Sequence, residues 1–121
     1  MESKNILIIE DEMIHGLFLK ASIQNCGFSV LDVVSRGEDA VKSAIKNRPG
    51  LIITDILLKD DMTGVDVIEE IHKHQKIPVI YITALSDNRM LQRAEMTRPL
   101  AIIYKPYEIN SLLSIVTDLL K

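Results

Sequence analysis

Five short runs of apolar residues, separated by segments with helical spacing, constrain the fold of this chain more than any other feature. The runs span residues 5–9, 28–34, 51–55, 77–82 and 100–104, and most are rich in Ile, Leu and Val. Continuous runs of this kind are typical of strands that are buried on both faces of a parallel sheet. Because strands that alternate with helices are joined by right-handed crossovers, the pattern predicts a doubly wound (βα)5 fold. This is an α/β three-layer sandwich around a five-stranded parallel sheet.

The segments between the runs have apolar residues at helical intervals, which predicts amphipathic helices. We expect helices to begin near residues 13, 38, 65, 87 and 110, the fourth of them capped by Ser86 or Asp87. The first helix ends before Gly27 and carries an apolar stripe of the kind that usually faces the core. The stripe consists of Ile14, Leu17, Phe18 and Ala21. Cys26 is expected to be a small core residue, and Ile45 of the second helix is expected to face inward.

Composition excludes several classes of protein. The 121 residues fit one domain over residues 1–121, and the single Cys excludes an internal disulfide, which suits a reducing, cytoplasmic setting. A formal charge of -3 offers no positive field for nucleic acid, so direct nucleic-acid binding is not expected. No stretch approaches the roughly 18 apolar residues of a membrane span, so we also expect no membrane contact.

Polar side chains follow four of the five predicted strands. Glu10 and Asp11 follow the first, Asp55 ends the third, Thr83 follows the fourth and Lys105 follows the fifth. Because the carboxyl ends of parallel strands meet at one edge of the sheet, these side chains are expected to converge there. An isolated Asp after a strand is more often the cap of a turn, and the accompanying groups are what favour a functional site.

Three carboxylates and one ammonium group leave this edge negatively charged, which favours a bound cation. Magnesium prefers oxygen ligands and usually takes one or two carboxylates while keeping several waters. Asp11 and Asp55 therefore suffice as its side-chain ligands, with Glu10 acting through a bound water. Calcium is disfavoured, since nothing here resembles its loop of alternating oxygen ligands.

A cation beside a carboxylate also suits phosphoryl transfer, in which the protein positions the reactants and neutralises charge. Asp55 would be the nucleophile and would form an aspartyl phosphate. The Thr83 hydroxyl and the Lys105 ammonium could each reach one phosphoryl oxygen. No His, Ser or Cys base is required for this chemistry.

Four motifs occur in order along the chain. They are Ile8-Ile9-Glu10-Asp11-Glu12, Thr54-Asp55-Ile56, Ile82-Thr83-Ala84 and Tyr104-Lys105-Pro106. In this arrangement the whole chain resembles the receiver domain of two-component response regulators, and is similar to single-domain chemotaxis-type regulators with a flavodoxin-like fold. The resemblance implies that Asp55 accepts a phosphoryl group from the phosphohistidine of a histidine kinase or a histidine phosphotransfer protein. It also implies a magnesium site formed by Glu10, Asp11, Asp55 and the backbone carbonyl of Leu57.

In that family the residues matching Thr83 and Lys105 contact the phosphoryl group and transmit its presence to an output surface. The resemblance therefore implies a signalling phosphoacceptor that catalyses only its own phosphorylation and slow autodephosphorylation, and not an enzyme acting on other substrates. The output protein or domain is not identified by the sequence. A homodimer through the last helices is a further expectation.

The sequence departs from the usual family pattern in the loop after Asp55 and in the last strand. The loop from Asp55 to Gly64 is one residue longer than the commonest form, and Lys59 lies near a position where many members have proline. The family usually has Tyr or Phe three residues before the lysine, as a rotamer switch coupled to the threonine. Here that position is Ile102, so we expect Thr83 to be coupled to a weaker or different output signal.

Two other functions compete with the receiver interpretation. A receiver-like docking module that is not phosphorylated would be favoured if a key residue were missing, and none is. A small phosphatase with Asp55 as nucleophile typically needs a second acid two residues later, where this chain has Leu57. Leu57 is instead expected to slow hydrolysis or to pack against the loop. His15, His72 and His74 have no metal-binding spacing with one another or with Asp or Glu residues, and we expect them on the surface or partly packed.

Overall fold

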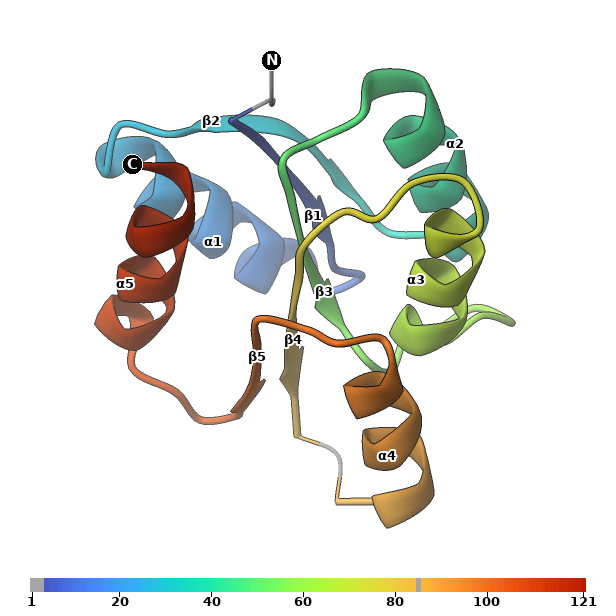
Figure 1. Ribbon diagram of the computed structural model, residues 1–121. Coiled ribbons are helices and arrows are strands. Elements are labelled where there is room, and N and C mark those ends of the chain that lie inside the picture. The colour runs from blue at the N-terminus through green and yellow to red at the C-terminus, as the bar shows by residue number, and fades with distance from the viewer. Residues whose placement is uncertain (1–3, 85) are drawn as a thin grey trace.

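A computed structural model describes residues 4–84 and 86–121, which form a five-stranded parallel sheet between two layers of helices (Figure 1). The elements in chain order are β1 (Asn5–Ile9), α1 (Met13–Asn25), β2 (Ser29–Val34), α2 (Gly37–Asn47), β3 (Leu51–Asp55), α3 (Gly64–His72), β4 (Val79–Thr83), α4 (Asn88–Met96), β5 (Ala101–Tyr104) and α5 (Ile109–Leu120). The strand order is β2-β1-β3-β4-β5, and all neighbouring strands are parallel. The predicted doubly wound, flavodoxin-like fold is therefore confirmed.

The helices cover the sheet on both faces, with α1 and α5 on one side and α2, α3 and α4 on the other (Figure 1). Alternate residues of each strand enter opposite cores. In β1, for example, Ile8 packs with α1 and α5, whereas Leu7 packs with α2 and α3. Every residue of β3 and β4 is buried. Burial on both faces explains why these strands read as continuous apolar runs.

The packed face of α1 is not the one that the sequence predicted. Its buried residues are Gly16, Leu19 and Ile23, whereas the four residues of the predicted stripe are exposed. Leu and Ile side chains lie on more than one side of this helix, so its apolar spacing is compatible with more than one orientation. Gly16 decides between them, because a Cβ at that position would lie 2.9 Å from Cγ1 of Val33. The helix therefore approaches the sheet through its glycine.

Two further burial predictions are wrong. Cys26 follows the last residue of α1 and is exposed, because its backbone caps the helix end outside the core. Ile45 is 40% exposed, because α2 turns Ala40 and Ala44 to the sheet and leaves Ile45 on its flank.

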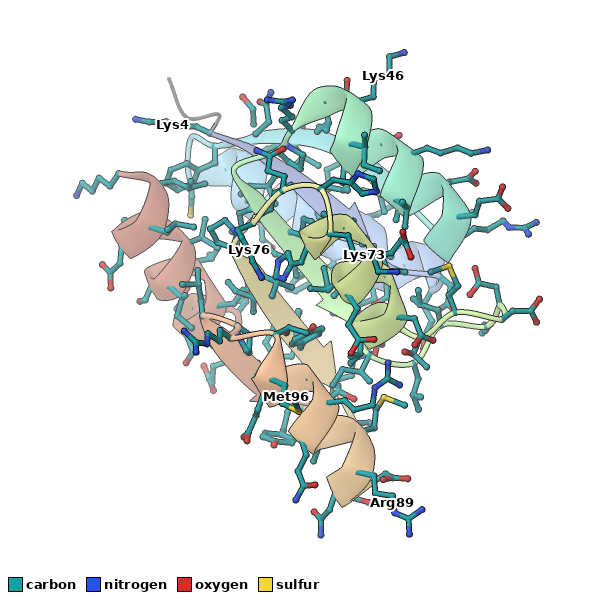
Figure 2. The ribbon with its side chains drawn as sticks, turned by 45° about the vertical axis from the view of Figure 1, so that its right-hand side comes forward. Lys4, Lys46, Lys73, Lys76, Arg89 and Met96 are labelled. Atoms are coloured by element: carbon teal, nitrogen blue, oxygen red, sulfur yellow. The ribbon has the colours of Figure 1, made fainter. Side chains whose placement is uncertain are left out.

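The fourth helix begins where expected and is the least buried of the helices. The Asp87 side chain accepts hydrogen bonds from the backbone N–H groups of Arg89 and Met90, so Asp87 is the cap of the two that were considered. Among the helix residues that the structure describes, α4 buries only Ala94, whereas each other helix buries at least three. Figure 2 shows α4 at the margin of the molecule, with Arg89 extending into solvent.

Across the described residues, 4–84 and 86–121, we find no helix with the combined length and apolar character required to cross a membrane.

Candidate functional site

The carboxyl edge of the sheet brings together acidic and basic side chains from three strands. Glu10 directly follows β1, Asp55 ends β3 and Lys105 directly follows β5. The Lys105 ammonium lies 2.6 Å from Oδ2 of Asp55 and 4.0 Å from Oε1 of Glu10. Strands β1 and β3 are neighbours in the sheet, and the chain proceeds from β1 to β2 on one side and to β3 on the other. These groups therefore lie at the topological switch point, where ligands bind in such sheets.

Asp55 is a buried carboxylate that the protein compensates only in part. It is 8% exposed, and its second oxygen, Oδ1, accepts a long 3.3 Å hydrogen bond from the Leu57 N–H. Burial raises the pKa of Asp55 above its usual value, and the negative charge of Glu10 raises it further, although Lys105 acts in the opposite direction. The negative charge at Asp55 is thus only partly compensated by the protein.

Glu10 has a more complete set of partners. Its Oε2 accepts a hydrogen bond of 3.1 Å from the Glu12 N–H, and its Oε1 contacts Nδ1 of His15. Burial acts to raise the pKa of Glu10, but the hydrogen bond from His15 and that from Glu12 outweigh it and lower the pKa. His15 is partly packed, as the sequence predicted, but the sequence did not reveal this contact with Glu10. His74 also lies near an acid, with its Nε2 4.0 Å from Oε2 of Glu70.

Tyr107 has a contact with His15 that the sequence did not reveal. Its hydroxyl lies 2.8 Å from Nε2 of His15, and the two rings meet edge to face with centroids 5.8 Å apart. A usable signal was present, because helical side chains lean toward the N-terminus of their helix. His15 lies in the first turn of α1, just after Glu10, so its ring leans back over the end of β1.

Asp11 directly follows Glu10 and holds the long loop after β3. Its Oδ2 accepts a hydrogen bond from the Lys59 N–H. Within the same loop, Asp60 accepts hydrogen bonds from the N–H groups of Gly37, at 2.7 Å, and Met62, at 2.9 Å. The loop is therefore attached to the end of β1 and to the first residue of α2, despite its extra residue.

Gly64 is a third residue whose role the sequence did not reveal. Its N–H donates a 2.6 Å hydrogen bond to the Ile56 carbonyl, and an added Cβ would lie only 2.0 Å from the backbone oxygen of Asp55. That oxygen also accepts a 2.8 Å hydrogen bond from the Thr54 hydroxyl. The close approach of α3 to the end of β3 therefore requires glycine.

Thr83 is buried at the end of β4, one residue beyond Ile82, the partner of Asp55 in the neighbouring strand. Its carbonyl accepts a 2.8 Å hydrogen bond from the Lys105 N–H, which connects the ends of β4 and β5. Ile102 pairs with Tyr81 in register and packs into the core below α4. Thr83 and Ile102 therefore belong to the adjoining pair of strands, as the sequence predicted.

The donor chemistry at this edge fits magnesium better than a metal that needs several nitrogen or sulfur ligands. Among residues 4–84 and 86–121, no three His, Cys, Asp or Glu side chains are arranged to hold a metal ion. Magnesium needs only one or two carboxylates, with water and carbonyl oxygens as its other ligands. Asp11 and Asp55 supply such oxygens, and the partly compensated charge of Asp55 favours a cation.

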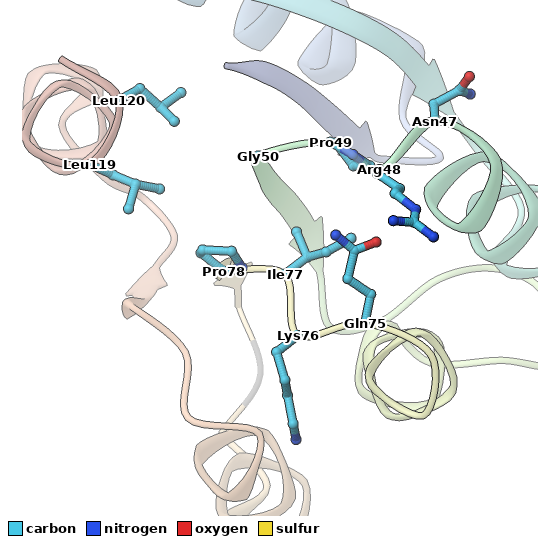
Figure 3. Close-up of a pocket in the computed structure, with 10 residues that line it drawn as sticks. All are labelled: Asn47, Arg48, Pro49, Gly50, Gln75, Lys76, Ile77, Pro78, Leu119 and Leu120. Atoms are coloured by element: carbon cyan, nitrogen blue, oxygen red, sulfur yellow. The ribbon is translucent and has the colours of Figure 1, made fainter. Parts of the chain in front are cut away.

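A hollow of about 530 Å³ lies at the opposite edge of the sheet, far from these groups (Figure 3). Its lining residues are Asn47, Arg48, Pro49, Gly50, Gln75, Lys76, Ile77, Pro78, Leu119 and Leu120. Figure 3 shows the Arg48 and Gln75 side chains approaching each other, while Lys76 points away. Because no carboxylate lines it, this hollow is not the candidate site despite its size.

Comparisons with known proteins agree with this geometry. A family model described as the response regulator receiver domain matches residues 6–117. The chain is 34% identical over 116 residues to the phyllosphere-induced regulator PhyR of Methylorubrum extorquens, covering 95% of this chain and 43% of that protein. It is 27% identical to the transcriptional regulatory protein PdtaR of Mycobacterium tuberculosis, covering 91% of this chain and 53% of that protein. The chain thus spans about half the length of these curated relatives.

Solved structures show the same similarity. The signal receiver domain of a modulated diguanylate cyclase from Desulfovibrio desulfuricans G20 has a TM-score of 0.89 at 28% identity, covering 98% of this chain and 94% of that chain. The signal receiver domain of a signal transduction histidine kinase from Syntrophus aciditrophicus has a TM-score of 0.86 at 32% identity. That match covers 98% of this chain and 90% of the other.

Proposed function

Because this chain belongs to the response regulator receiver domain family, we propose that it acts in phosphorelay signalling by accepting a phosphoryl group on Asp55. The donor is the phosphohistidine of a histidine kinase or a histidine phosphotransfer protein. The observation that carries the proposal is the contact between the buried Asp55 carboxylate and the Lys105 ammonium, 2.6 Å apart at the switch point of the sheet. Phosphorylation then changes the surface that an output partner binds.

The proposed reaction transfers the phosphoryl group without a general base. A carboxylate oxygen of Asp55 attacks phosphorus, the bond between phosphorus and the imidazole nitrogen breaks, and that nitrogen keeps the electron pair and takes a proton from solvent. Burial raises the pKa of Asp55, which increases the basicity of its carboxylate and thus its strength as a nucleophile. The product is an aspartyl phosphate, a mixed anhydride.

Lys105 and Thr83 have complementary roles in this proposal. As the phosphoryl group arrives, the Lys105 ammonium exchanges its contact with Asp55 for a charge-assisted hydrogen bond to a phosphoryl oxygen. The Thr83 hydroxyl, at the end of the neighbouring strand, donates to another. The backbone hydrogen bond from the Lys105 N–H to the Thr83 carbonyl would couple a movement at the end of one strand to the end of the other.

The same edge would hold a magnesium ion through Asp11, Asp55 and the Leu57 carbonyl oxygen, with Glu10 acting through a bound water. When bound, the ion would withdraw negative charge from the transferring phosphoryl group. Glu10 keeps its carboxylate ionised through its hydrogen bonds, because these lower its pKa. Asp11 keeps the loop that contains Leu57 close to the end of β1 through its bond with the Lys59 N–H.

The test is the intact mass of the protein after incubation with magnesium and acetyl phosphate. We expect the wild type to gain one phosphoryl group and Asp55→Asn to gain none, because Asn lacks the nucleophilic oxygen. Asp61→Asn is the matched control, since Asp61 is an exposed acid in the neighbouring loop, and this variant should gain the group. Phosphorylation of Asp55→Asn would contradict the assignment. Absence of phosphorylation in the wild type, with magnesium bound, would favour the docking module that is not phosphorylated.

A further inference from the structure

His15 connects the acidic edge of the sheet to the segment that follows Lys105. Its Nδ1 contacts Oε1 of Glu10 and its Nε2 lies 2.8 Å from the Tyr107 hydroxyl. His15 belongs to α1, whereas Tyr107 lies between β5 and α5, 92 residues later in the chain. The imidazole thus links two distant segments on either side of Glu10.

The direction of these hydrogen bonds follows from their chemistry. An ionised carboxylate only accepts, so Nδ1 of His15 must donate to Glu10. In the neutral imidazole the other nitrogen, Nε2, then accepts a hydrogen bond from the Tyr107 hydroxyl. The two hydrogen bonds therefore form a chain from the Tyr107 hydroxyl through the His15 imidazole to the Glu10 carboxylate. A movement of Tyr107 or of Glu10 then alters the orientation of the imidazole ring.

His15 also limits where the Glu10 carboxylate can lie. The Glu10 side chain is 2% exposed, with Oε2 held by the Glu12 N–H and Oε1 held by His15, and Lys105 at 4.0 Å. The His15 side chain is itself only 18% exposed. Glu10 therefore cannot change its position without displacing the imidazole.

We propose that His15 is a positioning residue that orients Glu10 for cation binding and transmits the presence of the cation to Tyr107. The inference deepens the proposed function, because it assumes that a divalent cation binds beside Glu10. A residue that hydrogen-bonds to a metal-binding side chain fixes the orientation of that side chain and raises the affinity of the site for the ion. Tyr107 offers an aromatic ring and a hydroxyl next to the site. Ile102, three residues before Lys105, offers neither.

The test is a magnesium titration of the unphosphorylated protein, followed by NMR of ring-labelled tyrosine. The chain has three tyrosines, and the Tyr107 signal is assigned by its loss in Tyr107→Phe. In the wild type we expect magnesium to shift the Tyr107 signal and to leave that of Tyr81 in place. In His15→Leu we expect the Tyr107 shift to be lost and the magnesium midpoint to rise about tenfold or more.

His15→Gln is the conservative variant. Its amide can donate to Glu10 and accept from Tyr107, so it should restore most of the magnesium affinity and of the Tyr107 shift. His74→Leu is the matched control, because His74 is an exposed histidine beyond the end of α3, and it should behave as wild type. If His15→Leu does not fold, Tyr107→Phe still removes one hydroxyl from this chain of hydrogen bonds and should raise the magnesium midpoint severalfold.

An unchanged magnesium midpoint and an unchanged Tyr107 shift in His15→Leu would overturn the proposal. A Tyr107 signal that does not shift with magnesium in the wild type would also overturn it. The mass experiment on Asp55 separates this result from the proposed function. A protein that is phosphorylated on Asp55 but shows no dependence on His15 contradicts only the positioning role. A protein that shows the His15-dependent shift but gains no phosphoryl group contradicts only the phosphoacceptor role.

Discussion

At Gly64 the backbone passes so close to the end of β3 that no side chain fits between them. The position is part of a capped helix start, because the Thr63 hydroxyl accepts from the Asp66 N–H and the Asp66 carboxylate accepts from the Thr63 N–H. The cap holds the first turn of α3 against the carbonyl of Asp55, which any Cβ at Gly64 would contact. The geometry of Asp55 thus depends on a residue nine positions away that carries no side chain.

We expect Gly64→Ala to lower the free energy of unfolding by about 3 kcal/mol, because the added Cβ must displace backbone and not a flexible side chain. Urea denaturation measures the change. Gly27→Ala is the control: its φ of 89° is unfavourable for alanine, but nothing lies within 4 Å of the new Cβ, so the cost should be about 1–2 kcal/mol. Equal costs for the two variants would show that the close contact does not determine the choice of glycine at position 64.

The two buried acids have pKa shifts of opposite direction, and these make opposite contributions to pH dependence. The pKa of Glu10 in the folded protein is below its usual value of 4.5. In the pH range between the lowered pKa and 4.5, the unfolded state therefore binds more protons, and stability rises with pH. The pKa of Asp55 is above its usual 3.8, so between 3.8 and the raised pKa the folded state binds more protons and stability falls as pH rises.

Replacing each acid by its amide should therefore change the pH profile in opposite ways. In Glu10→Gln, the free energy of unfolding should increase less than in the wild type as pH rises toward 4.5. In Asp55→Asn, it should increase more than in the wild type as pH rises above 3.8. Urea denaturation of the metal-free proteins between about pH 3 and 6 measures both slopes. Changes of the same sign in the two variants would contradict the assigned directions.

Helix α1 has a second apolar stripe that the core does not use. Met13 is 77% exposed, Ile14 85%, Leu17 55% and Phe18 49%. Phe18 also borders a shallow hollow with Lys105 and Tyr107, so the stripe is continuous with the edge that carries Asp55. If a phosphohistidine reaches Asp55 as we propose, the protein that carries it would cover this edge, and we expect it to contact the exposed stripe of α1.

Phe18→Ser should therefore slow phosphotransfer from a histidine kinase while leaving phosphorylation by acetyl phosphate and the free energy of unfolding nearly unchanged. Leu19→Ser is the contrasting variant. Leu19 is 1% exposed, so its loss should lower the free energy of unfolding by about 2–5 kcal/mol. Transfer rates from kinase and from acetyl phosphate, measured side by side, provide the comparison. Equal slowing with both donors would assign Phe18 to the chemistry or the fold and not to docking.

At the scale of the whole molecule, the proposed cation would join segments that are far apart in sequence. Asp11 follows β1, whereas Asp55 and Leu57 lie at and beyond the end of β3. Only folding brings the ends of β1 and β3 to the same edge of the sheet. A ligand that binds this edge in the folded state alone stabilises that state by mass action. Thermal unfolding of the intact chain should therefore depend on magnesium.

We expect magnesium at 100 times its Kd to stabilise the wild type by about 2.7 kcal/mol, which raises the melting temperature by several degrees. Asp11→Asn should abolish most of this increase, since it removes one carboxylate ligand. Asp61→Asn, an exposed acid outside the proposed ligand set, should retain it. The same magnesium-dependent increase in all three proteins would indicate general ionic stabilisation and not a site.

Much of the architecture was predictable because it depends on local patterns. Continuous apolar runs and helical spacing indicated each of the elements, and parallel strands force their carboxyl ends to one edge, which brought Glu10, Asp55 and Lys105 together as expected. The burial of α1 was not predictable in this way. Its apolar residues occupy two stripes, and the close approach of Gly16 to Val33 selects the one that packs.

The sequence by itself determined the succession of strands and helices along the chain and the identities of the polar groups at the strand ends. Both follow from periodicity and chain direction, which are local properties. Only the tertiary structure decided that His15 contacts Glu10 and Tyr107, and that Gly64 lies against Asp55. Contacts between residues 92 positions apart depend on how α1 and the segment after β5 meet at the sheet edge. That meeting is set by packing of the whole core, whereas the local signal in α1 indicates only that His15 leans toward the end of β1.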